Sequence, residues 1–239
     1  MKLASSVQEL ALSHAKEEDP KESCGCVVVF KGRQRYSPCK NIAETPDEHF
    51  VLSPDDYLKA EEKGEIIAII HSHPCTNHSP SPADRVACEQ SGLPWFVVNP
   101  KTEKWGYCEP EGFELEYVGR EFSHGIVDCY TLWQDWYKRE LGILMSHYDR
   151  RDQWWNKGEN LYLDNFEKEG MREVPLEEMQ YGDILLMQLD SPVPNHAAIY
   201  LGNNLVLHHV QGRLSSRDVY KWGGYYHKAT SKCLRHESR

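Results

Sequence analysis

The sequence lacks an excess of positive charge. Its 239 residues include 27 Lys and Arg against 37 Asp and Glu, which gives a net charge of -10. When the chain is divided at Gly112, 12 basic and 18 acidic residues precede the division and 15 and 19 follow it. Because binding to nucleic acid or to anionic lipid requires a basic surface, we expect neither half to bind a polynucleotide.

The sequence also lacks a long hydrophobic run. No apolar segment approaches the roughly 20 residues of a membrane-spanning helix. Residues 1–20 are amphipathic, whereas a signal peptide would be continuously apolar. We therefore expect no membrane span and a protein that is made and folded in the cytoplasm.

A disulfide framework is missing as well. The eight cysteines show neither disulfide-framework spacing nor a C-x-x-C pair, so most are expected to be free thiols. What the chain does contain is 40% hydrophobic residues, including 11% aromatics, which is typical of a folded protein. Its length allows two domains of about 120 residues.

The first half predicts an α/β unit. An amphipathic helix ends at Pro20, and further helices and strands alternate after it. The expected strands are 24–30, 65–73, 95–99 and 104–109, and the expected helices are 57–64 and 82–92. The segment 108–122 contains turn-forming residues without a clear period and is the expected linker. The domains are therefore expected at 1–112 and 113–239.

The second half predicts an α+β domain. Apolar and aromatic residues between Cys129 and Leu144 repeat at helical spacing. Strands joined by Gly and Asn turns are expected at 181–189, 195–204 and 205–220. The polar and aromatic segment 150–174 has no clear pattern. A helix followed by a strand meander is the order of an α+β fold.

A group of polar residues follows the expected strand 65–73. His71 and His73 are one residue apart, so both imidazoles leave the same face of a strand and can bind one ion. Ser81 is placed as a helix N-cap, with Asp84 in the first turn. If strand end and helix start converge, two imidazoles and one carboxylate leave a fourth position for water, as in a catalytic zinc site.

A zinc site of this kind benefits from a general base. Glu22 lies just before the buried strand 24–30 and is the nearest carboxylate with reason to point inward. Ser81 would offer a hydroxyl to a developing oxyanion. Taken singly, these residues are more often a polar strand end or a capping pair worth about 1 kcal/mol. Together they favour a metal site.

The combination of Glu22, His71-Ser-His73-Pro and Ser81-x-x-Asp84 resembles the JAMM signature of the JAB/MPN metalloprotease family. The resemblance covers about residues 1–110 and implies a mixed sheet with helices. It also implies Zn²⁺ held by His71, His73 and Asp84, with Glu22 as general acid/base and Ser81 assisting the oxyanion. The implied reaction is hydrolysis of a peptide or isopeptide bond.

Three other potential ligands lie near this signature in the sequence: Cys24, Cys75 and His78. The family pattern gives none of them a role. We therefore expect them to be structural.

Cys129 stands at the expected start of the aromatic helix, in the segment GIVDCYTLW. A lone cysteine there is more often a buried small residue than a nucleophile. However, a helix dipole and free backbone N–H groups favour the reactive thiolate. His196 heads an expected strand, and His208 on the next strand could orient it as the third member of a Cys-His-polar triad. His209 is a rival for that position, because a shift of the strand register by one residue would bring it to the face that His208 otherwise occupies. The spacing favours His208.

The order of cysteine helix, strand, histidine strand and polar strand resembles the NlpC-type papain-like cysteine peptidases, many of which cut peptidoglycan stem peptides. The resemblance covers about residues 113–239 and implies a helix packed on an antiparallel sheet. The matching residues are Asp128-Cys129, Gly182-Asp183 at the start of a strand, His196 and His208.

Two details of the second resemblance concern the substrate. Tyr117, twelve residues before Cys129, occupies the place of the family's substrate-side tyrosine. Members with well-defined cell-wall specificity tend to have Asp-Cys-Ser-Gly, but this chain has Asp128-Cys129-Tyr130-Thr131. The departure affects the groove that reads the substrate more than it affects catalysis.

A JAMM domain followed by an NlpC-type domain is similar to the tail assembly proteins of lambda-like tailed bacteriophages. The segments GREFSHGIVDCY and LHHVQGRLSSRDVY carry this likeness across the second domain. The resemblance implies a protein made in the host cytoplasm that helps other tail proteins to form the tail tip. Three hypotheses follow: a double peptidase acting on peptidoglycan peptides at infection, a protease that processes a tail protein during assembly, and a structural assembly factor with silent sites.

Overall fold

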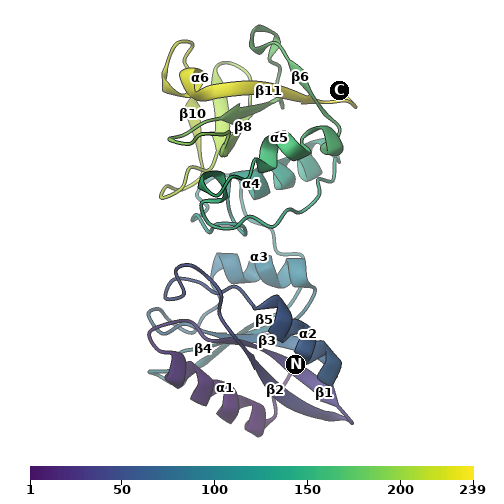
Figure 1. Cartoon of the computed structure of the whole chain (residues 1–239), viewed down its shortest axis with the longest axis vertical. Helices are drawn as coiled ribbons and strands as arrows, with labels where there is room; N and C mark the ends of the chain where they lie inside the picture. Colours follow the sequence, from purple (N-terminus) through teal and green to yellow (C-terminus); the bar gives the residue numbers. More distant parts are fainter. The chain divides into compact units, whose positions relative to one another are not determined.

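The computed structural model describes residues 1–239. The chain divides into two compact units, Met1–Glu114 and Leu115–Arg239, each with its own sheet and its own hydrophobic cores (Figure 1). None of the helices has the length and the apolar composition that crossing a bilayer requires.

The first unit is built on a mixed sheet, as expected, and this sheet has five strands. Its strand order is β2-β1-β3-β4-β5, in which β3 and β4 are parallel and the other neighbours are antiparallel. The strands are β1 (Cys24–Phe30), β2 (Arg33–Cys39), β3 (Glu65–Ser72), β4 (Trp95–Val98) and β5 (Trp105–Cys108). The helices are α1 (Ser5–Glu18), α2 (Pro54–Lys63) and α3 (Pro82–Ser91).

Helices cover both faces of this sheet (Figure 1). Because strand side chains alternate, the neighbours Ile69 and Ile70 belong to different cores. Val7 of α1 packs in the core that contains Ile70. Ala60 of α2 and Cys88 of α3 pack in the core that contains Ile69.

The sequence does not predict β2. Its residues are mostly polar and alternate between exposed and partly buried positions, and Pro38 lies within it. A proline has no N–H to donate, but an edge strand tolerates it. β2 is such an edge, since it pairs only with β1.

The second unit is a six-stranded antiparallel sheet with helices, which confirms the expected α+β organisation. The strand order is β10-β9-β8-β7-β11-β6. The strands are β6 (Met171–Val174), β7 (Ile184–Met187), β8 (His196–Tyr200), β9 (Leu205–His208), β10 (Ser216–Val219) and β11 (Thr230–His236). The helices are α4 (Cys129–Trp136), α5 (Leu161–Asn165) and α6 (Tyr225–Ala229), with single turns η1 (Tyr137–Leu141), η2 (Trp154–Asn156), η3 (Glu167–Glu169) and η4 (Leu176–Glu178).

The aromatic helix is shorter than its sequence pattern predicts. After α4 the helix continues as the π-helical turn η1. This turn ends at Gly142, which adopts a left-handed conformation with φ of 69°. Glycine accepts this conformation without strain and commonly ends a helix. Leu144 therefore lies beyond the helix, and it is 78% exposed.

The two faces of the second sheet are covered by different helices. Leu132 and Trp133 of α4 pack in one core with Ala197 and Leu207 of the sheet. The other face carries a separate core, which contains Ala198, Val206 and Tyr220 and is flanked by Tyr226 of α6. This alternation decides where the histidines of β8 and β9 lie.

Candidate active sites

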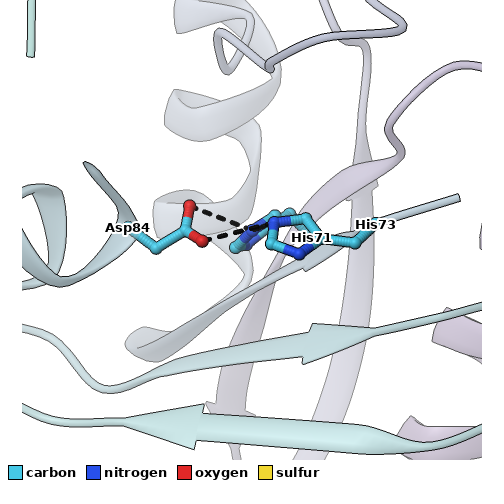
Figure 2. A group of neighbouring side chains, drawn as sticks. All are labelled: His71, His73 and Asp84. Atoms are coloured by element: carbon cyan, nitrogen blue, oxygen red, sulfur yellow. Dashed lines mark hydrogen bonds and ion pairs between the residues drawn. The ribbon is translucent and has the colours of Figure 1, made fainter. Parts of the chain in front are cut away.

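His71, His73 and Asp84 meet between the end of β3 and the start of α3, and all three are buried (Figure 2). The Nε2 atoms of the two histidines are 3.1 Å apart. The carboxylate of Asp84 faces both rings, with Oδ1 3.2 Å from His71 Nε2 and Oδ2 3.2 Å from His73 Nε2.

This donor set fits a zinc ion. Ligand atoms held at about 2.0–2.1 Å in a tetrahedron lie about 3.3 Å from one another, which is close to the separations found here. The Nδ1 atom of His73 contacts the backbone carbonyl oxygen of Asn77 at 2.9 Å, a contact that turns its Nε2 toward the other ligands. The ring of His71 stacks on Phe50 with centroids 4.6 Å apart.

Strand register brings Glu22 to the same place. The antiparallel pairing of β1 with β3 sets Cys24 opposite His71. Glu22 precedes Cys24 by two residues and His73 follows His71 by two, so the same register places Glu22 beside His73. The carboxylate oxygen Oε1 of Glu22 lies 3.9 Å from His73 Nε2, and the residue is 8% exposed. A buried carboxyl group thus lies next to the three potential ligands.

Ser81 and Asp84 form a capping box at the start of α3. Ser81 Oγ accepts a hydrogen bond from the backbone N–H of Asp84 at 3.1 Å, and Asp84 Oδ2 accepts one from the backbone N–H of Ser81 at 2.7 Å. The structural and the metal-site interpretations of this pair are therefore compatible. The helix cap fixes the carboxylate that faces the histidines.

The electrostatics of the site favour a positive charge among these residues. Burial opposes the ionisation of Asp84, but His71 and His73 outweigh it and hold the pKa of Asp84 well below its usual range. Burial also opposes protonation of His73, yet Asp84 and Glu22 raise its pKa above the ordinary value. For Glu22, burial dominates and raises the pKa of the carboxyl.

The structure does not bring the three neighbouring residues into this group. Cys75 is exposed and His78 is partly exposed. Cys24 is buried in the core beneath α2 and α3, where burial raises the pKa of its thiol far above the ordinary value.

In the second unit, Cys129 is the first residue of α4. Asp128 caps this helix: its Oδ1 accepts from the backbone N–H groups of Tyr130 and Thr131 at 3.0 and 2.9 Å. The Thr131 hydroxyl oxygen in turn accepts from the backbone N–H of Asp128 at 2.8 Å. Both residues after Cys129 thus have a structural role: Thr131 completes the helix cap, and the Tyr130 ring is buried in the core.

Arg150 neutralises the capping aspartate. Its Nε donates to Asp128 Oδ2 at 2.9 Å, and the two side chains are 5% and 3% exposed. Its remaining N–H groups donate to the carbonyl oxygens of Tyr148 and Gly125 at 2.7 and 2.9 Å. Burial opposes the charge on Asp128, but Arg150 outweighs it and lowers the pKa of that carboxyl.

Cys129 and His196 line one cavity of about 250 Å³. Tyr162 also lines it, and its hydroxyl lies 3.3 Å from Cys129 Sγ. The other walls are mainly aromatic and polar side chains, among them Phe122, His124, Asp128, Arg150, Trp154, Trp155, Asp190, Asn195 and His209.

His196 and His208 are in contact, as the strand pairing predicts. The Nε2 atom of His196 lies 3.1 Å from the Nδ1 atom of His208. His209 points to the other side of β9, where its ring packs edge-on against Phe122 at 5.1 Å between centroids. The geometry therefore favours His208 over His209 as the partner of His196.

The resting protonation of this pair differs from the expected thiolate. Desolvation raises the pKa of the Cys129 thiol to about 11, and the contact with Tyr162 offsets only part of this effect. Burial lowers the pKa of His196 to about 3. Near neutral pH the free site thus holds a thiol and a neutral imidazole. The helix dipole is outweighed by burial.

Two other residues from the sequence motif lie elsewhere. The Tyr117 hydroxyl donates to Glu140 at 3.0 Å on an exposed surface, and Tyr117 is not among the residues that line the cavity. Asp183 is fully buried and forms an ion pair with Arg235, at 2.7 Å between Oδ2 and Nη2. This pair ties β11 to the loop before β7.

Sequence reasoning missed Tyr162 and Arg150. Both come from the segment 150–174, whose single turns and five-residue helix give no hydrophobic period. The only signal was the density of aromatic residues in a polar segment. That signal does not say which side chain reaches the cysteine.

Family models match both units. Residues 4–107 match the family described as prokaryotic homologs of the JAB domain. Residues 116–235 match the NlpC/P60 family. The chain is also similar to desampylase of Haloferax volcanii, with 28% identity over 136 residues that cover 51% of this chain and 91% of that protein.

Two relatives match across both units. Tail tip assembly protein K of Escherichia phage N15 is 38% identical over 230 residues, which cover 95% of this chain and 92% of that protein. Tail tip assembly protein K of Escherichia phage lambda is 47% identical over 173 residues, which cover 72% of this chain and 84% of that protein. The resemblance to phage tail assembly proteins is thereby confirmed, and the chain belongs to the family of tail tip assembly proteins K of lambda-like phages.

Proposed function

We propose that this chain is a bifunctional hydrolase of peptide or isopeptide bonds in a bacteriophage tail. Residues 1–112 would form a zinc metallopeptidase domain and residues 113–239 a cysteine peptidase domain. The observation that carries the proposal is the contact between His196 and His208 at 3.1 Å, beside a cavity that also contains Cys129. An assembly factor without catalysis would need no such array.

The first site supports metal-assisted hydrolysis. His71, His73 and Asp84 would hold Zn²⁺, which supplies Lewis acidity to a carbonyl group when bound. Glu22 Oε1 takes a proton from the attacking water and gives it to the leaving amine nitrogen. The raised pKa of Glu22 suits both transfers. Ser81 Oγ accepts from the N–H of Asp84, so its own O–H can donate to the oxyanion.

The second site supports nucleophilic catalysis. Cys129 Sγ attacks the carbonyl carbon while its proton passes to the free Nδ1 atom of His196, because Nε2 faces His208. The Tyr162 hydroxyl, 3.3 Å from the sulfur, donates to the oxyanion. His196 then protonates the leaving amine, and water hydrolyses the thioester. Tyr117 remains a candidate for the substrate side of this site only if the substrate extends beyond the cavity.

The family suggests where these activities act. Other tail proteins are the partners to expect for a tail tip assembly protein. We propose that the chain works in the host cytoplasm during assembly, is carried in the virion tail tip, and cleaves peptidoglycan stem peptides in the host periplasm at infection. The enzyme name of the Haloferax volcanii relative supports hydrolysis by the first fold.

Digestion of purified peptidoglycan with mass spectrometry of the products tests both activities. Wild type should release stem-peptide fragments, and Cys129→Ala and His71→Ala should each remove a separate set of products. If wild type releases none, immature tails are the second substrate to examine: Glu22→Ala or Cys129→Ala should then leave an uncleaved tail-protein precursor. Intact peptidoglycan together with full-length tail proteins would support the purely structural role and contradict the proposal.

A further inference from the structure

His196, His208 and Asp218 lie on one diagonal across three neighbouring strands. In β8 and β9, Ala198 is opposite His208; in β9 and β10, His208 is opposite Ser216. His196 precedes Ala198 by two residues and Asp218 follows Ser216 by two. Since side chains two residues apart share a face, the three polar groups are on the same face of the sheet.

Distances show that this diagonal is continuous. His196 Nε2 is 3.1 Å from His208 Nδ1, and His208 Nε2 is 3.2 Å from Asp218 Oδ2. The His208 side chain is 1% exposed, and that of Asp218 is 23% exposed. A carboxylate thus stands directly behind the third member of the Cys-His-His array.

We propose that Asp218 is a positioning residue that determines which ring nitrogens of His208 and His196 carry protons. This inference rests on the proposed cysteine peptidase function. A carboxylate only accepts, so His208 carries its proton on Nε2. His208 Nδ1 is then an acceptor, and His196 must place its own proton on Nε2. This leaves His196 Nδ1 free to receive the proton of Cys129.

The groups around Asp218 hold it in this role. The Tyr226 hydroxyl donates to Oδ2 at 3.0 Å, and the Ser216 hydroxyl donates to Oδ1 at 3.1 Å. Arg213 Nη2 lies 3.5 Å from Oδ2. The Tyr226 ring also packs edge-on against the His208 ring, with centroids 4.9 Å apart.

Other charged or titratable groups act on the same histidines. Asp128 favours and His209 opposes a positive charge on His196, and Arg213 opposes one on His208. Asp218 is the carboxylate that touches the array itself. When His196 becomes an imidazolium during attack, the charge of Asp218 therefore stabilises it through His208.

The test compares wild type with Asp218→Asn, which has nearly the same shape without the charge, and with Asp218→Ala. Alkylation of Cys129 by iodoacetamide is followed from pH 5 to 10 on its own peptide by mass spectrometry, so that the exposed Cys75 does not interfere. Because this range lies below the pKa of Cys129, we expect Asp218→Asn, by raising that pKa by about one unit, to slow alkylation about tenfold at every pH measured. Glu173→Gln, which removes one charge from β6 at the other end of the sheet order, should leave the profile unchanged.

Nitrogen-15 NMR of the histidine side chains gives a second measurement that needs neither substrate nor catalysis. Wild type should show the Nε2–H form for His196 and His208, whereas Asp218→Ala should show a mixture of forms at His208. Folded variants with the wild-type pH profile and wild-type histidine forms would overturn the inference. A peptidoglycan digest in which wild type releases no product that depends on Cys129 would instead count against the proposed peptidase, and the NMR comparison would still decide the role of Asp218.

Discussion

The Tyr162 hydroxyl lies 3.3 Å from the Cys129 sulfur, although 33 residues separate them in the chain. Burial holds the pKa of Tyr162 well above its ordinary value, so the phenol keeps its proton at neutral pH and can donate it. This makes Tyr162 the candidate for the oxyanion donor in the second site.

Replacing Tyr162 by Phe should lower kcat for peptide cleavage about 10²-fold with little change in KM, because the lost donor acts mainly in the transition state. The rate of product release in the peptidoglycan digest measures this effect. Tyr148→Phe is the matched control: its hydroxyl bonds Glu169, and Tyr148 does not line the Cys129 cavity. Equal rates for Tyr162→Phe and wild type would remove Tyr162 from the mechanism.

The zinc content of purified protein should depend on three residues. His71→Ala and Asp84→Ala should each lose the ion, because two remaining ligands bind zinc poorly. Glu22→Gln should keep the ion and lose hydrolysis, since Glu22 is expected to move protons rather than to bind metal. Elemental analysis beside a cleavage assay separates the two effects. His78→Ala should behave as wild type, and a loss of zinc in that variant would show that the ligand set is wrong.

Removal of the Arg150 charge should destabilise the second unit strongly. Arg150→Met leaves Asp128 buried without its positively charged partner, which costs about 3–5 kcal/mol in free energy of unfolding. Glu173→Gln, in an ion pair on the surface of the same unit, should cost less than about 1 kcal/mol. Urea unfolding followed by tryptophan fluorescence measures both. Similar losses in the two variants would mean that the buried pair contributes no more than a surface pair.

Acid should weaken the second unit before its carboxylates titrate. Burial lowers the pKa of His196 to about 3 and that of His209 to about 4, against 6.5 for an accessible histidine. The unfolded chain therefore binds more protons below pH 6.5, and stability that is complete above 6.5 is lost as the pH falls toward 4. For His196 the slope is at most about 1.4 kcal/mol per pH unit.

Urea unfolding at pH 7.5, 6.5, 5.5 and 5 tests this pH dependence. Five of the seven tryptophans, at 133, 136, 154, 155 and 222, belong to the second unit and report on it. His196→Gln should flatten the curve. A wild-type stability that is constant over this range would contradict the buried neutral histidines.

Much of the first site could be predicted because its chemistry is local in the sequence. The spacing of His71 and His73 on a strand, and the capping pattern of Ser81 and Asp84, are set by backbone geometry alone. Their convergence with Glu22 required the pairing of β1 with β3. Before the structure, the position of Glu22 just ahead of a buried strand and the family resemblance both pointed to this residue, but neither showed the pairing.

The second site was less predictable because its decisive contacts are tertiary. Strand alternation was enough to set His208 against His196. No local pattern brings Tyr162 to Cys129, or Arg150 to Asp128, since each pair is more than twenty positions apart in the chain. The pKa of Cys129 could not be read from its helix position either, because burial by distant segments outweighs the dipole.

If the site binds zinc as proposed, the capping box of α3 would couple folding to metal uptake. Oδ2 of Asp84 both closes the first turn of the helix and faces His73, so this one atom takes part in helix formation and would take part in metal binding. An ion that binds the ordered carboxylate more tightly than the frayed one must, by thermodynamic linkage, stabilise the helix start by the same free energy. Zinc would then stabilise the start of α3. A substitution that destabilises the helix start would lower the affinity for zinc, even where the substituted residue is not a ligand.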